Sequence, residues 1–527
     1  MKTNLSVCLL ILGSVIFSCK SSDEPPHKKP NILFAIADDA SFPHMGAYGT
    51  SWVNTPAFDR VAAEGILFTN AYTPNAKCSP SRSIILTGRN SWQLEEAANH
   101  VPFFPNKFLS FIEVLGGNGY YTGFTGKGWA PGNPGEKDGK PRELTGPRFQ
   151  KHSLEPPTTA ISTNDYAKNF ADFLEGNSED EPFFFWYGST EPHRAYEFQS
   201  GVNKAGKKLT DIDAVPGFWP DIDSVRHDML DYAMEVEYFD QHLQQMIEVL
   251  EEQGELENTL IIVTSDNGMP FPRVKGNAYE WSHHMPFAVM WPYGIKYPGR
   301  NVDDFISFTD IAPTILELAE ISPSEVGMPD MTGRSLLNIF KSNLSGRIEK
   351  SRNAVIIGQE RHDVGRPNDV GYPIRGIITD DYVYLHNFET DRWPSGNPET
   401  GYLNTDGSPT KTVILNRRRD SNSAFYWSEN FGKRPTEELY LKQTDPECRN
   451  NLSLHPEQQS AKEALKKQLF DQLRAEGDPR MFGRGEVFDN YPYADPNTAN
   501  FYSRYLEGDT PKAGWVNKTD FENEPLD

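Results

Sequence analysis

Short apolar runs alternate with segments of helical periodicity along the first two thirds of the chain. Four runs have the composition of buried strands: "NILFAIADD" (31–39), "GYYTGFTGKG" (119–128), "PFFFWYGSTEPH" (182–193) and "NTLIIVTSDNG" (258–268). Helical signals lie between them, including "NTPAFDRVAAEG" (54–65) and a segment over 231–254 with apolar side chains at helical spacing. This alternation predicts an α/β fold, with a mostly parallel sheet sandwiched by helices.

The pattern changes near residue 350. Runs at 353–360, 372–388 and 437–447 resemble sheet strands separated by turns, and an amphipathic helix is predicted over about 457–475. We therefore predict a catalytic-type α/β domain over 30–350 and a smaller C-terminal α+β domain with an antiparallel sheet over 351–485. An aromatic and polar tail follows over 486–527.

The N-terminus has the features of an export signal. Residues 1–19 combine a basic start, an apolar run from Val7 to Phe17 that is too short to span a bilayer, and the pair Ser18–Cys19. The junction resembles a bacterial lipoprotein box, which predicts that Cys19 is acylated and that residues 20–29 are a linker. The expected location is the periplasm or the cell surface of a bacterium, and a soluble periplasmic product is the alternative.

Charge and cysteine content narrow the choice of partners. The formal net charge of −23 argues against nucleic acid and against a basic membrane-binding face, so a membrane is expected only through the lipid anchor. Of the four cysteines, Cys8 and Cys19 belong to the signal, which leaves Cys78 and Cys448. Two cysteines do not make a disulfide framework, so Cys78 needs another explanation.

Polar residues gather where the predicted strands end. Ligands bind at the carboxyl ends of parallel strands, and Asp38, Asp39, Asp266 and Asn267 together offer the hard oxygen ligands suited to calcium or magnesium. Further polar candidates follow the strands: Lys127, His193, Lys275 and the pair His283–His284. Each of these side chains could equally be a turn, surface or backbone-bonding residue when taken alone.

Cys78 opens the segment "CSPSRSIILTG". Pro80 suits the first turn of a helix and Gly88 its end, so Cys78 and Arg82 are predicted at a helix N-terminus that favours an anion. A buried structural cysteine and a thiolate nucleophile both remain open on these residues alone.

The same segment resembles the signature of type I sulfatases, in which a Cys-x-Pro-x-Arg core directs oxidation of the cysteine to formylglycine. The resemblance implies an alkaline-phosphatase-like fold, one calcium ion, and maturation by a formylglycine-generating or anaerobic sulfatase-maturing enzyme. It implies a metal site made of Asp38, Asp39, Asp266, Asn267 and the formylglycine from Cys78. It also implies catalytic roles for Arg82, Lys127, His193 and Lys275.

Two positions depart from the family pattern. Lys77 replaces an apolar or hydroxyl residue, and Trp129 stands where many sulfatases have a histidine two residues after the lysine. His193 is therefore the better candidate for protonating the leaving atom.

Several further stretches, "SDNGMPFP" above all, resemble heparan N-sulfatases, the N-sulfoglucosamine sulfohydrolases. The implied function is hydrolysis of sulfate from a glycosaminoglycan saccharide, with glucosamine N-sulfate as the expected target. A carbohydrate O-sulfatase, for example on glucosamine 6-O-sulfate, is an alternative. Others are a phosphodiesterase or phosphonate hydrolase with a second metal near His283 and His284, and a glycan-binding protein without activity. Arg361, His362 and Arg366 are candidate substrate contacts, with a solvated charged loop as the alternative.

Overall fold

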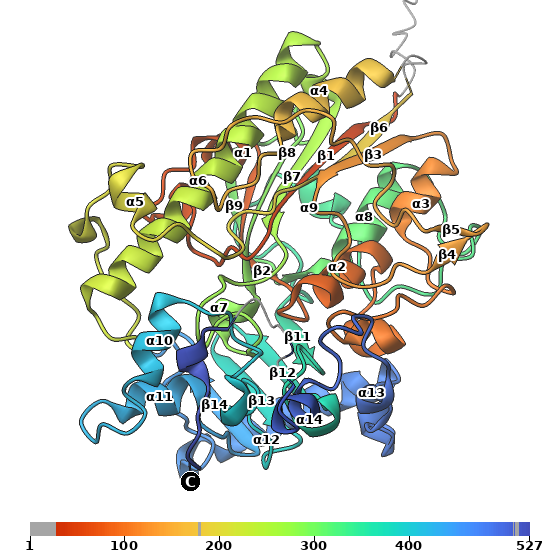
Figure 1. Ribbon diagram of the computed structural model, residues 1–527. Helices are drawn as coiled ribbons and strands as arrows, with labels where there is room; N and C mark the ends of the chain where they lie inside the picture. Colours follow the sequence, from red (N-terminus) through yellow and green to blue (C-terminus); the bar gives the residue numbers. More distant parts are fainter. Residues whose placement is uncertain (1–27, 178–180, 510, 512–515, 527) are drawn as a thin grey trace, which may run out of the picture.

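The computed structural model describes residues 28–177, 181–509, 511 and 516–526 (Figure 1). The predicted signal segment 1–19, its Cys19 and most of the linker 20–29 lie outside the described residues. Within the described part of the chain, no helix is both long and apolar enough to cross a membrane.

The large sheet is mostly parallel, as predicted. Its central strand β1 pairs in parallel with β6 and β7, and only β8 runs against its neighbours β7 and β2. In spatial order the strands are β10 (Ile306–Ser307), β2 (Ile66–Tyr72), β8 (His284–Met290), β7 (Thr259–Ser265), β1 (Asn31–Ala37), β6 (Phe183–Gly188) and β3 (Tyr121–Gly126), with β9 (Arg300–Val302) beside β2. A two-stranded ribbon, β4 (Glu136–Lys137) and β5 (Lys140–Pro141), stands apart.

Helices cover both faces of this sheet (Figure 1). Alternate side chains of β1 point to opposite faces, so Leu33 and Ala35 join one core cluster while Ile32 and Phe34 join the other. The first cluster contains residues of α1 (Pro56–Ala63), α4 (Tyr166–Gly176) and α6 (Asp223–Glu252). The second contains residues of α2 (Cys78–Thr87), α3 (Phe111–Gly116), α8 (Ile311–Leu318) and α9 (Leu337–Lys341).

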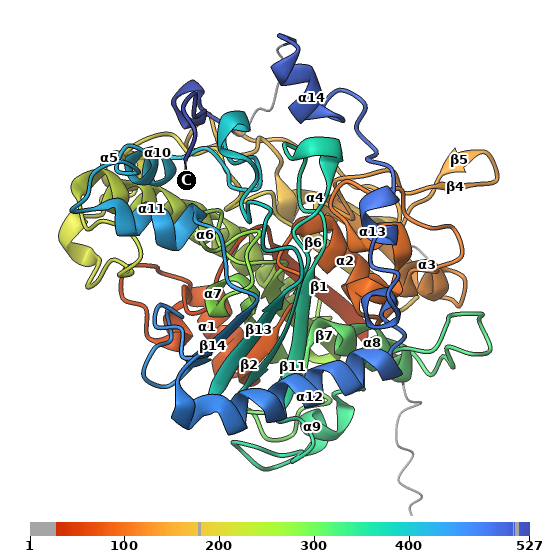
Figure 2. The same ribbon diagram turned by 90° about the horizontal axis from the view of Figure 1, so that it is seen from below.

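The C-terminal part forms an antiparallel sheet, also as predicted. Its strands are β11 (Ala354–Gln359), β12 (Ile374–Thr379), β13 (Tyr382–Asn387) and β14 (Glu437–Leu441). The helix α12 (Gln459–Ala475) lies across one face of the sheet (Figure 2), and its Leu465, Leu469 and Leu473 share a core with Ile377. The other face packs on Tyr72 and Phe305 of the first domain.

The remaining helices are short. They are α5 (Ser200–Asn203), α7 (Glu280–His283), α10 (Pro409–Leu415), α11 (Ala424–Phe431), α13 (Val487–Asn490) and α14 (Phe501–Leu506). The last two belong to the predicted tail, and each buries one phenylalanine side chain, Phe488 in α13 and Phe501 in α14.

The start of α1 is marked by a local sequence signal but stabilised by a long-range contact. Thr55 occupies the N-cap position, but its side chain makes no capping bond. The carboxylate of Asp240, on α6, instead accepts hydrogen bonds from the backbone nitrogens of Ala57 and Phe58 at 2.9 and 2.8 Å. The helix predicted over 231–254 also begins earlier, at Asp223.

Candidate active site

The site lies where the carboxyl ends of neighbouring strands meet. Ala37 and Ser265 are paired at the ends of β1 and β7, so the residues that follow them, Asp38–Asp39 and Asp266–Asn267, are brought together. The strand β3 ends next to Lys127, and a loop after β6 carries His193. The parallel pairing of these strands thus collects side chains that are up to 229 positions apart.

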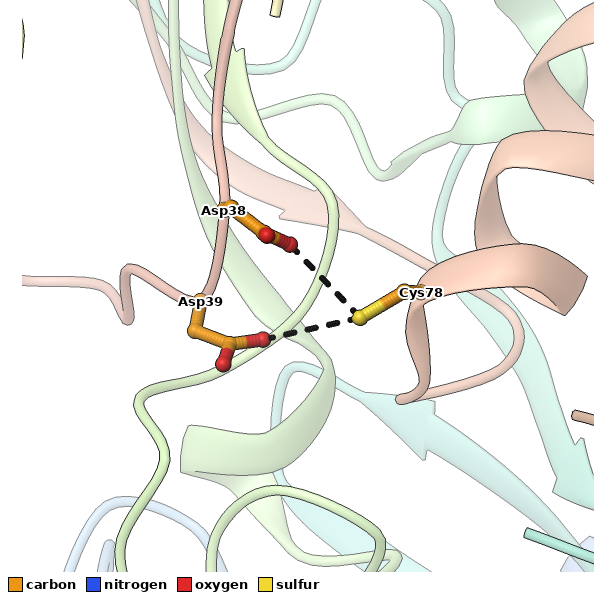
Figure 3. Close-up of side chains that lie close together, drawn as sticks. All are labelled: Asp38, Asp39 and Cys78. Carbon is orange, nitrogen blue, oxygen red and sulfur yellow. Dashed lines mark hydrogen bonds between the residues drawn. The ribbon is translucent and has the colours of Figure 1, made fainter. Parts of the chain in front are cut away.

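Cys78 is the first residue of α2 and faces both aspartates (Figure 3). Its Sγ lies 3.6 Å from Asp38 Oδ1 and 3.9 Å from Asp39 Oδ1, and only 1% of the residue is exposed. Burial raises the pKa of the Cys78 thiol, so the thiolate is disfavoured. A protonated thiol is a weak nucleophile, which counts against direct attack by this sulfur.

Asp38 is bound by cations. Lys127 Nζ lies 2.7 and 2.6 Å from its two carboxylate oxygens, and the Arg82 guanidinium lies 3.5 Å from Oδ1. Burial alone would raise the pKa of Asp38, but the positive charges of Lys127 above all, and of His193 and Arg82, lower that pKa to about 2. Asp38 is therefore an anion at neutral pH.

Asp39 lies at the centre of the polar network. Its Oδ2 is 2.6 Å from Lys275 Nζ and 3.9 Å from His193 Nε2, while its Oδ1 accepts from Asn267 Nδ2 at 2.7 Å. Its backbone has φ of 77°, in the left-handed region that non-glycine residues seldom occupy. Such outliers cluster at functional sites, because the surrounding structure must hold them in place.

Arg82 ties the helix α2 to the strand ends. Its Nε donates to Asp266 Oδ2 at 2.8 Å, and its Nη1 donates to the carbonyl oxygens of Lys127 and Gly128, both at 2.8 Å. Burial raises the pKa of Asp266, and Arg82 opposes that shift. The guanidinium is thus fixed beside Cys78 by interactions on several sides.

His193 and Lys275 complete the arrangement. His193 Nδ1 donates to the Arg194 carbonyl at 2.6 Å, which directs Nε2 toward Asp39. Burial by itself would lower the pKa of Lys275, but Asp39 and Asp406 raise it well above its ordinary value. Asp406 Oδ2 lies 3.1 Å from Lys275 Nζ.

The residues around Cys78 fit a hard divalent cation. Asp38, Asp39 and Cys78 each offer a ligand atom, all within 4.8 Å of one another. The buried Oδ1 of Asn267 has no hydrogen-bond partner among the described residues, and such an orphaned oxygen is what a metal ligand looks like without its ion. Carboxylate and amide oxygens suit calcium better than zinc.

The balance of charged side chains around Cys78 also favours a bound cation. Four carboxylates (Asp38, Asp39, Asp266 and Asp406) surround three fixed cations (Arg82, Lys127 and Lys275). An anionic substrate would meet net negative charge here unless a bound cation reversed it.

Trp129, the departure from the family pattern, is a structural residue. It is largely buried, its Nε1 donates to Ser83 Oγ of α2 at 2.8 Å, and its ring meets Phe104 edge to face at 5.3 Å. The side chain therefore anchors the loop after β3 to α2 and presents no titratable group.

Replacing Trp129 by histidine is expected to destabilise the protein without raising its turnover. The smaller ring leaves a cavity, which should cost about 2–4 kcal/mol of unfolding free energy and lower Tm. Trp129→Phe loses the hydrogen bond and part of the buried ring but keeps an apolar six-membered ring, so it should cost less, about 1–2 kcal/mol. A higher kcat in Trp129→His, measured beside Tm, would contradict this assignment.

Other candidates are held away from the site. His283 Nδ1 lies 2.7 Å from the Thr73 carbonyl, and His284 contacts Glu280 at 3.0 Å and the Thr69 carbonyl at 2.9 Å. In both rings burial lowers the pKa. These contacts match the alternative of a backbone-bonding pair.

The loop candidates of the second domain are also engaged with the protein itself. Arg366 donates to the carbonyl oxygens of Trp393 and Pro394, both at 2.8 Å, and His362 Nε2 lies 2.9 Å from Asn75 Oδ1. Arg361 donates to the carbonyl oxygens of Tyr491 and Pro492. None of the three is among the residues that line the cavity beside His193 and Lys275, and all three are buried rather than solvated.

That cavity holds residues that the sequence did not single out. Beside Lys77, the site residues His193 and Lys275, and Asp406, it is lined by His100, Asp363 and the tail residues 493–495. No local motif marks these positions, because they come together only through tertiary contacts.

Comparison with known proteins gives a consistent result. A model of the sulfatase family matches residues 30–321, and a second, for the C-terminal part of N-sulphoglucosamine sulphohydrolase, matches residues 274–394. An "Ulvan-active sulfatase" from Formosa agariphila is 28% identical, covering 86% of this chain and 81% of its own. The human "N-sulphoglucosamine sulphohydrolase" is also 28% identical, with 83% and 89% covered.

Solved structures share the fold. One, described as a complex with its substrate D-glucosamine-2-N,6-O-disulfate, superposes with a TM-score of 0.60 at 20% identity, covering 86% of this chain and 99% of its own. The combination of the mostly parallel sheet, its helices and the C-terminal antiparallel sheet agrees with the alkaline-phosphatase-like architecture expected from the sequence.

Proposed function

The chain belongs to the sulfatase family and is a hydrolase of sulfate esters or sulfamates, and from this premise we propose that it removes the N-sulfate of glucosamine from heparin or heparan sulfate saccharides. The observation that carries the proposal is the approach of Cys78 Sγ to Asp38 and Asp39, beside the ammonium of Lys127. A nucleophile position, an oxygen-ligand cluster and cations for a sulfo group are thereby joined at one point.

Formylglycine made from Cys78 and one calcium ion are part of the proposal. The ligands from unmodified side chains would be the oxygens of Asp38, Asp39, Asp266 and Asn267, and the formylglycine at position 78 would complete the site. When present, the hydrated aldehyde supplies an oxygen nucleophile with a second hydroxyl for releasing sulfate, and the ion supplies positive charge at the sulfo oxygens.

The protein's own side chains would perform three tasks. Lys127 and Lys275 neutralise charge that develops on the sulfo oxygens, because both ammonium groups stay protonated. Arg82 fixes the start of α2 against Asp266, which keeps residue 78 in line with the sulfur atom of the substrate's sulfo group. His193 holds a proton at Nε2 for the leaving nitrogen, with its orientation set by the Arg194 carbonyl.

The choice of N-sulfate is supported by the match of residues 274–394 to the C-terminal model of N-sulphoglucosamine sulphohydrolase. A glucosamine 6-O-sulfatase is the second candidate, because an "N-acetylglucosamine-6-O-sulfatase" from Bacteroides thetaiotaomicron is 25% identical over 75% of this chain. A two-metal phosphodiesterase is less well supported. In the described part of the chain, Asp38, Asp39 and Cys78 form the one cluster of His, Cys, Asp or Glu side chains whose ligand atoms lie close enough together to hold a metal ion.

The test is release of inorganic sulfate from glucosamine saccharides bearing a single N-, 2-O-, 3-O- or 6-O-sulfate, using protein co-produced with a maturing enzyme. We expect release from the N-sulfated sugar at the highest kcat/KM. Release from the 6-O-sulfated sugar alone would favour the second candidate. Hydrolysis of a phosphate diester to a monoester and an alcohol, without release of sulfate from any sugar, would favour the phosphodiesterase.

We also propose export as a lipoprotein acylated at Cys19, which follows from the N-terminal sequence. Its partners would then be the sulfated saccharide, the maturing enzyme and, through the lipid alone, a membrane.

A further inference from the structure

A cavity of about 430 Å³ lies directly beside the reacting end of the site. His193 and Lys275 line one part of it, so this space is open to the remaining atoms of a substrate whose sulfo group reaches Cys78. Its volume is in the range of pockets that hold small organic ligands. Another part of the wall is made by His100 and by Tyr493, Ala494 and Asp495 of the C-terminal tail.

The tail segment is fixed in place. The backbone nitrogen of Ala494 donates to the Val101 carbonyl at 2.9 Å, and Arg361 donates to the carbonyl oxygens of Tyr491 and Pro492 at 2.8 and 3.1 Å. The Arg361 guanidinium also lies over the Tyr493 ring at 5.4 Å. Residues 493–495 lie beyond both matched family regions, which end at 321 and 394, so the tail part of this wall comes from outside those regions, whereas His100 lies within the first.

His100, one of the residues that line the cavity, has a ring nitrogen without a hydrogen-bond partner among the described residues. The residue is 8% exposed, its Nδ1 lies 3.1 Å from Asp363 Oδ1, and its buried Nε2 has no partner among the described residues. Because a carboxylate only accepts, Nδ1 carries the proton, and Nε2 of the neutral ring is an acceptor. Its natural partner is a hydroxyl or amine donor, since a second sulfate or carboxylate has no proton to give.

The cations at this wall are already paired. Lys77 Nζ lies 2.7 Å from Asp363 Oδ2, and Lys275 Nζ lies 3.1 Å from Asp406 Oδ2. Asp495 adds a further carboxylate to the lining. The wall therefore offers hydrogen-bonding groups without surplus positive charge, which suits an uncharged ring better than an anionic one.

We propose that His100 and the tail residues Tyr493–Asp495 form a sugar subsite next to the sulfo site, which takes a hydroxyl-bearing ring without a second anionic group, with His100 Nε2 accepting a hydrogen bond from a sugar hydroxyl. The inference rests on the proposed function, because it assumes that the sulfo group occupies the Cys78 end. His100 is then a specificity-determining contact.

Equilibrium binding to the inactive Cys78→Ala protein tests this separately from catalysis. Calorimetry would compare glucosamine N-sulfate, glucosamine N,6-O-disulfate and inorganic sulfate on Cys78→Ala and on Cys78→Ala/His100→Phe. We expect the second variant to bind the monosulfated sugar about 10-fold or more weakly, as for a lost hydrogen bond to a buried group, with inorganic sulfate changed less than about 2-fold. We also expect the Cys78→Ala protein to bind glucosamine N-sulfate more tightly than glucosamine N,6-O-disulfate.

Two further variants guard against a general loss of structure. His100→Gln restores an acceptor and should recover part of the affinity for the sugar. His242→Phe, at a buried histidine of α6, should change the affinity for neither the sugar nor inorganic sulfate. Equal loss of sugar and sulfate binding, or no loss of either in a folded His100→Phe protein, overturns the subsite. Failure of the proposed function looks different: Cys78→Ala binds the sugar, but mature protein releases no sulfate from it.

Discussion

Replacing Cys78 by alanine should abolish sulfate release, with kcat falling by about 10⁴-fold or more while saccharide binding persists. Residue 78 is the proposed origin of the nucleophile, and removal of a nucleophile leaves only the contribution of binding and charge stabilisation. Alanine removes one buried Sγ atom at the start of α2, where its contacts are the long ones to Asp38 and Asp39. The fold should therefore survive, and sulfate release and saccharide affinity can be measured on the same preparation.

Cys448→Ala is the matched control, because Cys448 is also a buried free cysteine but belongs to the core of the second sheet. It should leave kcat unchanged. Mass spectrometry of the peptide containing Cys78 in mature protein should show the net loss of one sulfur and two hydrogens and the gain of one oxygen. An active enzyme with an unmodified Cys78 would rule out the formylglycine mechanism.

Removing the proposed metal ligand Asp39 should have the second largest effect. Asp39→Asn is expected to lower kcat/KM by about 10³-fold, because a cation at the sulfo oxygens contributes several kcal/mol to such reactions. Asparagine tolerates left-handed backbone better than most residues, so the φ of 77° at this position need not disturb the fold. The loss should therefore reflect the site and not misfolding.

Calcium binding provides a readout of this prediction that does not depend on activity. Calcium at about 100 times its Kd should stabilise the wild-type protein by about 2.7 kcal/mol, seen as a higher Tm after a chelator-treated sample is resupplied. Asp39→Asn should lose most of that increase. Asp240→Asn is the control and should keep the increase in Tm. It also changes a buried carboxylate, but one that caps α1 and is not among the proposed metal ligands. An equal calcium response in Asp39→Asn and wild type would exclude Asp39 as a ligand.

Much of the architecture was accessible from local sequence. Apolar runs that end in Asp38–Asp39 and Asp266–Asn267 predicted strands whose ends meet, because a parallel sheet aligns carboxyl ends along one edge. Pro80 and Gly88 marked the limits of a helix that the structure places at Cys78–Thr87. Both signals depend on residues close together in the sequence. The folded protein keeps these elements because local sequence preference and tertiary packing favour the same structure there.

The missing parts depend on long-range contacts. His100 approaches Asp363 across 263 positions, and Asp240 caps a helix that begins 184 residues earlier, so no local pattern marks either pair. The basic residues of the 361–366 loop looked like ligands for an anion because charge is visible in sequence while burial is not. In the fold, Arg361 and Arg366 donate to backbone carbonyl oxygens and support the tail and its neighbours.

The depth at which Cys78 is buried has a consequence for the proposed maturation of this residue. Only 1% of the residue is exposed, and α2 is buried along its whole length. A second enzyme cannot close its own active site around a side chain in that position, so the proposed oxidation of Cys78 would have to precede the docking of α2 onto the sheet. On this proposal, maturation would be confined to the interval between translation and folding, and a chain that folds before it is modified would keep an intact thiol at position 78.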